Sequence, residues 1–160
     1  MGDVHIAAGA GFSNDRRELG EIAAQSLTLF EGHRYLVFEC LAERTLALAQ
    51  TADGHRRQVE RAIGYLEACI NTCILNDIKI ISNFGGSSPK RVAEAISGFL
   101  KQHNLRRKVG YVLGDELPVD DAEHDGKAIS CNAYIGANGI VEALKAGADI
   151  VVTGRVADPS

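Results

Sequence analysis

Four carboxylate residues follow short apolar runs of the chain, and positioned carboxylates are common general acids and bases in enzymes. They are Glu39, Glu43, Asp115 and Asp158. Packed together, they would supply the proton transfers needed for chemistry at an acidic carbon or a hydroxyl group. We take these four residues as the candidate catalytic set. The alternative role for each one is a helix cap or an ion pair.

The same stretches carry groups that hold anions and polar substrates. Glycine beside a helix start lets backbone N–H groups approach an anion, and arginine binds a carboxylate or phosphate through two parallel hydrogen bonds. Tight turns are the alternative role for the glycines, and structural ion pairs are the alternative for the arginines. The candidate substrate-binding residues are Gly9, Gly11, Arg44, Asn83, Gly85, Gly86, Ser87, Ser88, Asn132, Tyr134 and Arg155.

Cofactor and metal signals are weak. Gly9 and Gly11 match the beginning of a dinucleotide-binding fingerprint, and Glu39 stands where a ribose contact would fall, but position 14 is asparagine where the pattern has glycine. The cofactor therefore remains unknown, with nucleotide or phosphate binding at the glycine-rich loops as the alternative to catalysis. The four cysteines and five histidines are scattered, which predicts no metal site. Cys40 has no neighbouring histidine in the sequence, so we do not expect a catalytic thiol.

The elements that must position these residues alternate regularly. Short apolar runs bounded by glycine or polar residues predict strands at 6–8, 35–38, 78–81, 109–113 and 150–152. Apolar residues spaced by three and four predict helices at 15–30 and 57–75. A third helix is expected after Ser88 as N-cap with Pro89 in its first turn, and a fourth between Asn138 as N-cap and Gly147 as its stop. The acidic segment 116–127 is expected to be a solvated loop, with a lid as the alternative.

Strands alternating with helices predict an α/β fold with a mostly parallel sheet, flanking helices and a doubly wound arrangement. A partial β/α barrel is the alternative, because strand order cannot be read from one sequence. In such sheets ligands bind at the carboxyl ends of the strands, where all the candidate residues fall. The length of 160 residues predicts a single α/β domain over 1–160.

Composition narrows the classes of partner. Lys and Arg number 17 against 21 Asp and Glu, a net charge of −4, so no basic field is present to drive nucleic-acid binding. No run of 18 apolar residues is present, so we expect no membrane span. The N-terminus lacks the basic and apolar regions of a signal peptide, which favours a cytoplasmic protein with reduced thiols. With these classes set aside, the glycine-rich loops and arginines favour a small acidic or CoA-linked substrate as the partner.

Several strings resemble one known family, and they cover nearly the whole chain in order. The resemblance is to the N-terminal domain of the acyclic terpene utilisation (AtuA-like) family, a domain of unknown function. Residues 83–89 (NFGGSSP) are similar to that family's Asn-x-Gly-x-x-x-Pro pattern. The other matching strings are 8–12 (AGAGF), 35–45 (YLVFECLAERT), 133–137 (AYIGA) and 146–160 (AGADIVVTGRVADPS).

The resemblance implies a role in breaking down acyclic terpenes such as citronellol and geraniol through branched acyl-CoA intermediates. It further implies a carbon–carbon lyase, or another acyl-CoA-processing enzyme, acting on a thioester of the 3-hydroxy-3-isohexenylglutaryl-CoA type, which is like 3-hydroxy-3-methylglutaryl-CoA. Because family members are longer and the chain stops inside a strand-end loop, we expect it to be the N-terminal part of a longer protein. A homo-oligomer, or a partner chain supplying the C-terminal part, is then expected.

Overall fold

The computed structural model of the chain describes residues 2–42, 46–47, 51–118 and 130–157. Five strands form one parallel sheet in the order β1-β2-β3-β7-β4. They are β1 (Val4–Ala10), β2 (His33–Phe38), β3 (Lys79–Ser82), β7 (Ile150–Val152) and β4 (Val109–Tyr111). The five predicted strands and the mostly parallel α/β fold are therefore confirmed. Across these described ranges, no helix is both long and apolar enough to cross a membrane.

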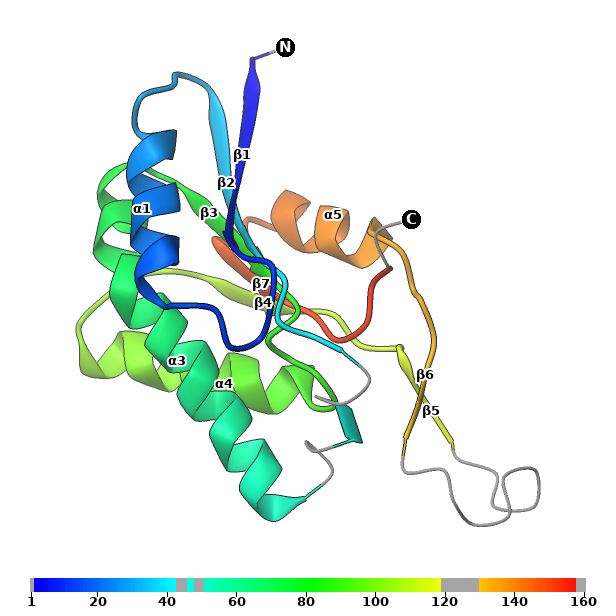
Figure 1. Cartoon of the computed structure of the whole chain (residues 1–160). Coiled ribbons are helices and arrows are strands. Elements are labelled where there is room, and N and C mark those ends of the chain that lie inside the picture. The colour runs from blue at the N-terminus through cyan, green and yellow to red at the C-terminus, as the bar shows by residue number, and fades with distance from the viewer. Residues whose placement is uncertain (1, 43–45, 48–50, 119–129, 158–160) are drawn as a thin grey trace.

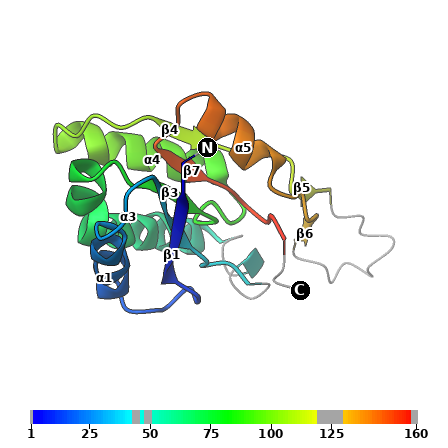
Figure 2. The ribbon, with the colours of Figure 1, turned by 90° about the horizontal axis from the view of Figure 1, so that it is seen from above.

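Helices cover both faces of the sheet, which confirms the doubly wound arrangement (Figures 1 and 2). On one side lie α1 (Glu18–Leu27), α3 (Ala52–Leu75) and α4 (Pro89–Gln102), and on the other lies α5 (Asn138–Lys145), against β4 and β7. From β1 to β4 the chain moves in one direction across the sheet, and from β4 to β7 it returns, so right-handed crossovers place α5 on the opposite side. The sheet does not close into a barrel.

The helix boundaries follow local chemistry, with three departures from expectation. α1 is shorter than the predicted 15–30, because it covers only Glu18–Leu27. α3 begins earlier than predicted, because the Thr51 hydroxyl caps it by accepting a hydrogen bond from the Gly54 N–H (2.9 Å). α5 begins one residue earlier, so Asn138 lies inside the helix and Ala137 is its N-cap. The predicted stop is confirmed: Gly147 has a φ of +85°, a conformation that glycine adopts without the cost other residues incur.

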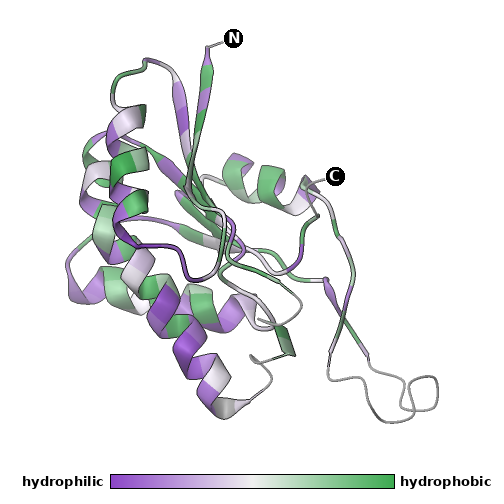
Figure 3. Cartoon of the chain, in the orientation of Figure 1, coloured by the Kyte–Doolittle hydropathy of each residue, from purple (hydrophilic) through white to green (hydrophobic). Residues whose placement is uncertain are grey.

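The core between the sheet and α1, α3 and α4 centres on three aromatic rings. Phe38, Tyr65 and Phe84 pack with centroid separations of 5.3 to 5.7 Å. A Cβ at Gly9 would lie 2.5 Å from the Phe38 ring, so this glycine leaves room for the core. Figure 3 shows apolar colour on the central strands and hydrophilic colour on the N-terminal half of α3. The two ends of α3 thus differ, since its C-terminal half contributes to this core.

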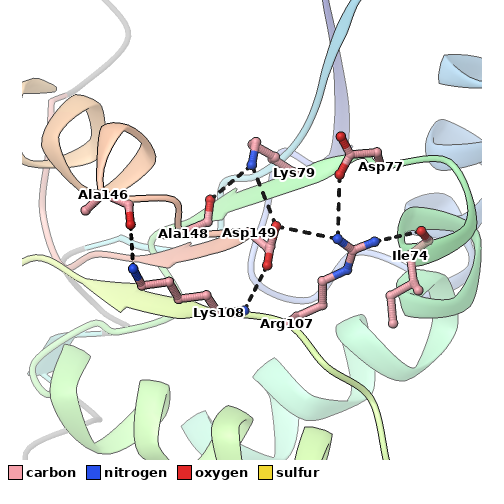
Figure 4. Close-up of polar contacts among 8 residues, drawn as sticks. All are labelled: Ile74, Asp77, Lys79, Arg107, Lys108, Ala146, Ala148 and Asp149. Carbon is pink, nitrogen blue, oxygen red and sulfur yellow. Dashed lines mark hydrogen bonds and ion pairs between the residues drawn. The ribbon is translucent and has the colours of Figure 1, made fainter.

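A polar cluster around Asp149, called here the Asp149 cluster, joins three strands at the amino edge of the sheet (Figure 4). The Asp149 carboxylate accepts a hydrogen bond from the Lys108 backbone N–H (2.8 Å) and pairs with Arg107 (3.5 Å) and Lys79 (3.6 Å). Arg107 also donates to the carbonyl of Ile74 (2.6 Å) at the end of α3. These contacts tie β7 to the starts of β3 and β4, at the edge opposite the candidate site residues.

A second, two-stranded sheet was missed by the sequence prediction. β5 (Glu116–Leu117) pairs antiparallel with β6 (Cys131–Asn132). The segment predicted as a loop therefore begins with a strand, and its residues 119–127 lie outside the described residues. The signal is weak because each strand is only two residues long, too short for an alternating pattern to emerge.

Candidate functional site

The carboxyl edge of the sheet contains a topological switch point at β3, β7 and β4. The chain leaves β3 toward α4 on one face and leaves β4 toward α5 on the other. Loops that diverge in this way open a crevice, which is where ligands bind in open α/β sheets. The switch point therefore identifies the part of the edge to examine for a site.

A surface pocket of about 590 Å³ lies at this switch point. One wall is the start of α4, with Ser87 and Ser88 before it and Lys90 and Arg91 in its first turn. The opposite wall runs from the end of β4 into β5 and includes Asp115. Its volume is in the range of small-molecule sites. The α4 wall thus carries two cations together with the carboxylate of Glu94, and the other wall is acidic.

Asp115 is the most constrained residue of the acidic wall. It is 2% exposed, and its Oδ2 accepts hydrogen bonds from the Arg155 backbone N–H (2.7 Å) and the Asn132 side-chain amide (3.1 Å). A Cβ at Gly154 would overlap the carboxylate, so glycine there allows this close approach. The structure therefore joins Asp115, Asn132 and Arg155, three predicted site residues from three separate parts of the chain.

Arg155 extends this group to a fourth predicted residue. Its guanidinium donates to the Tyr134 hydroxyl (2.9 Å) and lies over the Tyr134 ring, 4.9 Å from the centroid. Arg155 is 7% exposed, whereas Tyr134 is more than half exposed. The backbone of Arg155 is fixed by Asp115, and its guanidinium is fixed by the Tyr134 hydroxyl and ring. The side chain is therefore pre-oriented and loses little conformational entropy when it binds an anion.

The loop between β3 and α4 is tightly wound against β7. The Gly85 N–H donates to the Thr153 carbonyl (2.9 Å), and the Ser88 N–H donates to the Gly85 carbonyl (2.7 Å). Gly86 has a φ of +47°, and a Cβ there would overlap the side-chain amide of Gln58. Close protein neighbours thus account for both glycines, and their contact with a ligand stays a prediction. Ser88 occupies the N-cap position as expected, but its side chain makes no capping hydrogen bond.

Replacing Gly85 with alanine is expected to destabilise the protein by about 2 kcal/mol or more, because the new Cβ would lie 2.5 Å from the Thr153 carbonyl oxygen and 2.6 Å from the Pro89 Cα. Both neighbours are backbone and cannot turn away. Gly98→Ala in α4 is the matched control, since nothing lies within 4 Å of its added Cβ, and it should be neutral or stabilising. Thermal unfolding compares the two variants, and equal midpoints would contradict the close packing.

Glu39 and Asn83 form a separate pair at the ends of β2 and β3. The Asn83 amide nitrogen donates to Glu39 Oε2 (2.5 Å), and its oxygen accepts from the Cys40 N–H (2.7 Å). Glu39 Oε1 accepts from the Leu41 N–H (3.0 Å). The pair is thus brought together as expected, but neither residue lines the pocket that contains Asp115. Their catalytic and binding roles stay predictions.

Burial raises the pKa of the neighbouring Cys40 thiol to about 12, with the Glu39 carboxylate adding to the shift. The unfolded thiol ionises near pH 9, so this burial contributes stability that is fully present below pH 9 and is lost as the pH rises toward 12.

We expect a thiol-alkylating reagent at pH 8 to modify the half-exposed Cys131 well before Cys40, as mass spectrometry of peptides can measure. Equal rates would contradict the neutral, buried state of Cys40.

The remaining predicted residues are not joined to either group. Gly9 packs against the core, and the Gly11 N–H donates to the Asp15 carboxylate (2.9 Å) in the loop after β1. Glu43, Arg44 and Asp158 lie outside the described residues. Among the described side chains, no three of His, Cys, Asp and Glu gather as a metal site requires.

Sequence reasoning missed the basic wall of the pocket. Lys90 and Arg91 directly follow Pro89, and their place in the first turn of a predicted helix was a usable signal. Gly154 was also missed as a contact of Asp115. That contact joins the ends of two strands whose adjacency the sequence does not reveal.

Comparison with known proteins adds one match. The family model described as "acyclic terpene utilisation family protein AtuA" matches residues 4–160. No curated protein and no solved structure matches the chain. The match covers both walls of the pocket and every described candidate residue.

Proposed function

Since the chain belongs to the acyclic terpene utilisation (AtuA) family, we propose that it binds and cleaves a branched terpenoid acyl-CoA thioester at the switch-point pocket. The observation that carries this proposal is the buried Asp115 carboxylate in the wall of that pocket, opposite a basic helix start. The proposed substrate is a thioester of the 3-hydroxy-3-methylglutaryl-CoA kind that carries a longer branch. A carboxylate and a basic wall match the hydroxyl group and the acidic groups of such a molecule.

The proposed reaction is carbon–carbon cleavage. Asp115 takes the proton of the 3-hydroxyl group, the C–O bond becomes a carbonyl, and the adjacent C–C bond breaks. The electron pair passes to the neighbouring carbon as an enolate, which then takes up a proton. General-base catalysis contributes about 10²- to 10⁴-fold to such a step. The described hydrogen bonds to the carboxylate both reach Oδ2, which supports Oδ1 as the atom that accepts the proton.

Arg155 and Tyr134 adjoin Asp115 but are not part of the pocket lining, and we assign to them the charged end of a substrate that extends past Asp115. An arginine beside a tyrosine can bind a carboxylate and stabilise the oxyanion of the enolate. Arg155 also positions Asp115 through its backbone N–H. One residue thus connects substrate binding with the orientation of the proposed base.

The test incubates the chain with a branched 3-hydroxy-3-methylglutaryl-CoA analogue and follows products by mass spectrometry, with calorimetry for binding. Cleavage into a shorter thioester and a carbonyl compound is the expected result. Binding without any cleavage would contradict the catalytic role and support a ligand-binding domain instead. An absence of both binding and cleavage would overturn the proposal.

A further inference from the structure

We propose that the start of α4 is a phosphate subsite, formed by Ser87 and the first-turn residues Lys90 and Arg91. The ligand group is a phosphate monoester, such as the one on the ribose of coenzyme A. The inference rests on the proposed function for the identity of the substrate that carries this phosphate. The subsite itself is argued from the described residues alone.

The first observation is an unsatisfied hydroxyl. Ser87 is 7% exposed, belongs to the pocket wall, and its Oγ has no hydrogen-bond partner among the described residues. A buried hydroxyl without a partner costs free energy, so such groups usually mark a missing ligand or water. The Oγ atom is itself covered, so a phosphate oxygen would accept its hydrogen bond once the hydroxyl turns toward the pocket.

The second observation is the helix start itself. α4 has 14 residues, and the first N–H groups of a helix have no carbonyl partner within it. The Ser88 side chain makes no cap hydrogen bond, so it leaves these donors to another acceptor. The aligned peptide dipoles add about half a positive charge at this end, which favours an anion.

The cations of the pocket lie on its α4 wall, where the lining also includes Glu94. Arg91 is exposed in the first turn and makes no ion pair with another described residue, so its guanidinium is available to an anion. An ion pair joins Lys90 to Glu94 at this helix start, at 4.0 Å, between two side chains that are both more than 60% exposed. Such a pair is weak and exchanges readily for a phosphate. Asp115 and Glu116 lie on the opposite wall, so the phosphate is placed against α4.

The test titrates the chain, labelled with ¹⁵N, with inorganic phosphate and separately with 3′,5′-ADP, the nucleotide half of coenzyme A. We expect saturable shifts of the amide signals of Ser87, Ser88, Lys90 and Arg91 with both ligands, and tighter binding of the nucleotide. Arg91→Ala should weaken 3′,5′-ADP about tenfold, and Ser87→Ala about fivefold, through loss of hydrogen bonds to a charged group.

Two control variants test whether the loss of any buried hydroxyl, or of any positive charge on α4, would weaken binding equally. Ser82→Ala removes another buried hydroxyl without a described partner, outside the pocket, and Lys101→Ala removes a positive charge from the last turn of the same helix. Both should bind 3′,5′-ADP within twofold of the unmodified chain. Equal weakening by Lys101→Ala and Arg91→Ala, or no saturable shift at Ser87–Arg91, would overturn the subsite. Because Arg91 is exposed, its variant folds and keeps the test decisive.

The two proposals fail separately. Cleavage of the thioester without any nucleotide-induced shift at α4 would retain the proposed function and overturn the subsite. Nucleotide binding at α4 without binding or cleavage of the thioester would retain the subsite and overturn the proposed function.

Discussion

Replacement of Asp149 by alanine is expected to lower the free energy of unfolding by about 3 kcal/mol, because it removes the acceptor of a backbone N–H and the carboxylate that two cations share at a partly buried position. The Asp149 carboxylate joins β7 to the starts of β3 and β4, and its side chain is 22% exposed. For a domain of this size the midpoint of thermal unfolding should fall by about 6 to 12 °C. Calorimetry or circular dichroism would measure the shift.

Asp53 provides the matched control for this prediction. Its contacts to Arg56 and Arg57 are shorter, at 2.6 Å each, but its side chain is 49% exposed at the start of α3. Solvent screens such pairs, so Asp53→Ala should shift the midpoint far less than Asp149→Ala. Equal shifts for the two variants would contradict the prediction that burial makes the Asp149 contacts contribute more to the free energy of unfolding than the Asp53 contacts.

Asp115→Asn is expected to reduce cleavage of the branched thioester at least about 100-fold, because the amide cannot accept the hydroxyl proton. The fold should persist, since the asparagine oxygen can still accept the hydrogen bond from the Arg155 N–H. Substrate binding should weaken far less than turnover, because the groups on the basic wall are unchanged. Turnover rates with calorimetric affinities would separate the two effects.

Asp149→Asn is the control for this second experiment. Asp149 and Asp115 both accept a backbone N–H and both lie at sheet edges, but at opposite ends of the strands. Asp149→Asn should cost stability and leave turnover per folded molecule unchanged, whereas Asp115→Asn should do the reverse. A similar loss of turnover in both variants would refute the assignment of Asp115 as the proton acceptor.

Much of the site could be predicted one residue at a time. Asp115, Asn132, Tyr134 and Arg155 are each predicted from loops expected at one edge of the sheet, and the structure joins them by hydrogen bonds. Glu39 and Asn83 were selected by the same reasoning and also meet. What could not be predicted is that these six residues form two groups, and that Asp115 alone among the six lines the pocket.

The reason for this division is the strand order. β7 inserts between β3 and β4, so Thr153 meets Gly85 while Gly154 and Arg155 meet Asp115. Glu39 follows β2, one strand farther from this insertion. Strand order depends on long-range packing of whole elements, and no local spacing in the sequence records it. The Asp149 cluster was missed for the same reason.

The sequence by itself determined the elements and the edge at which chemistry is expected. Apolar periodicity, the proline after Ser88 and the glycine at 147 act within a few residues, so they can be interpreted locally. The tertiary structure decided which of those residues share a pocket, that Ser87 is buried without a described partner, and that Lys90 and Arg91 face an acidic wall. Burial and contacts between charges depend on segments that are far apart in the sequence and pack against one another. They therefore exist only in the folded chain.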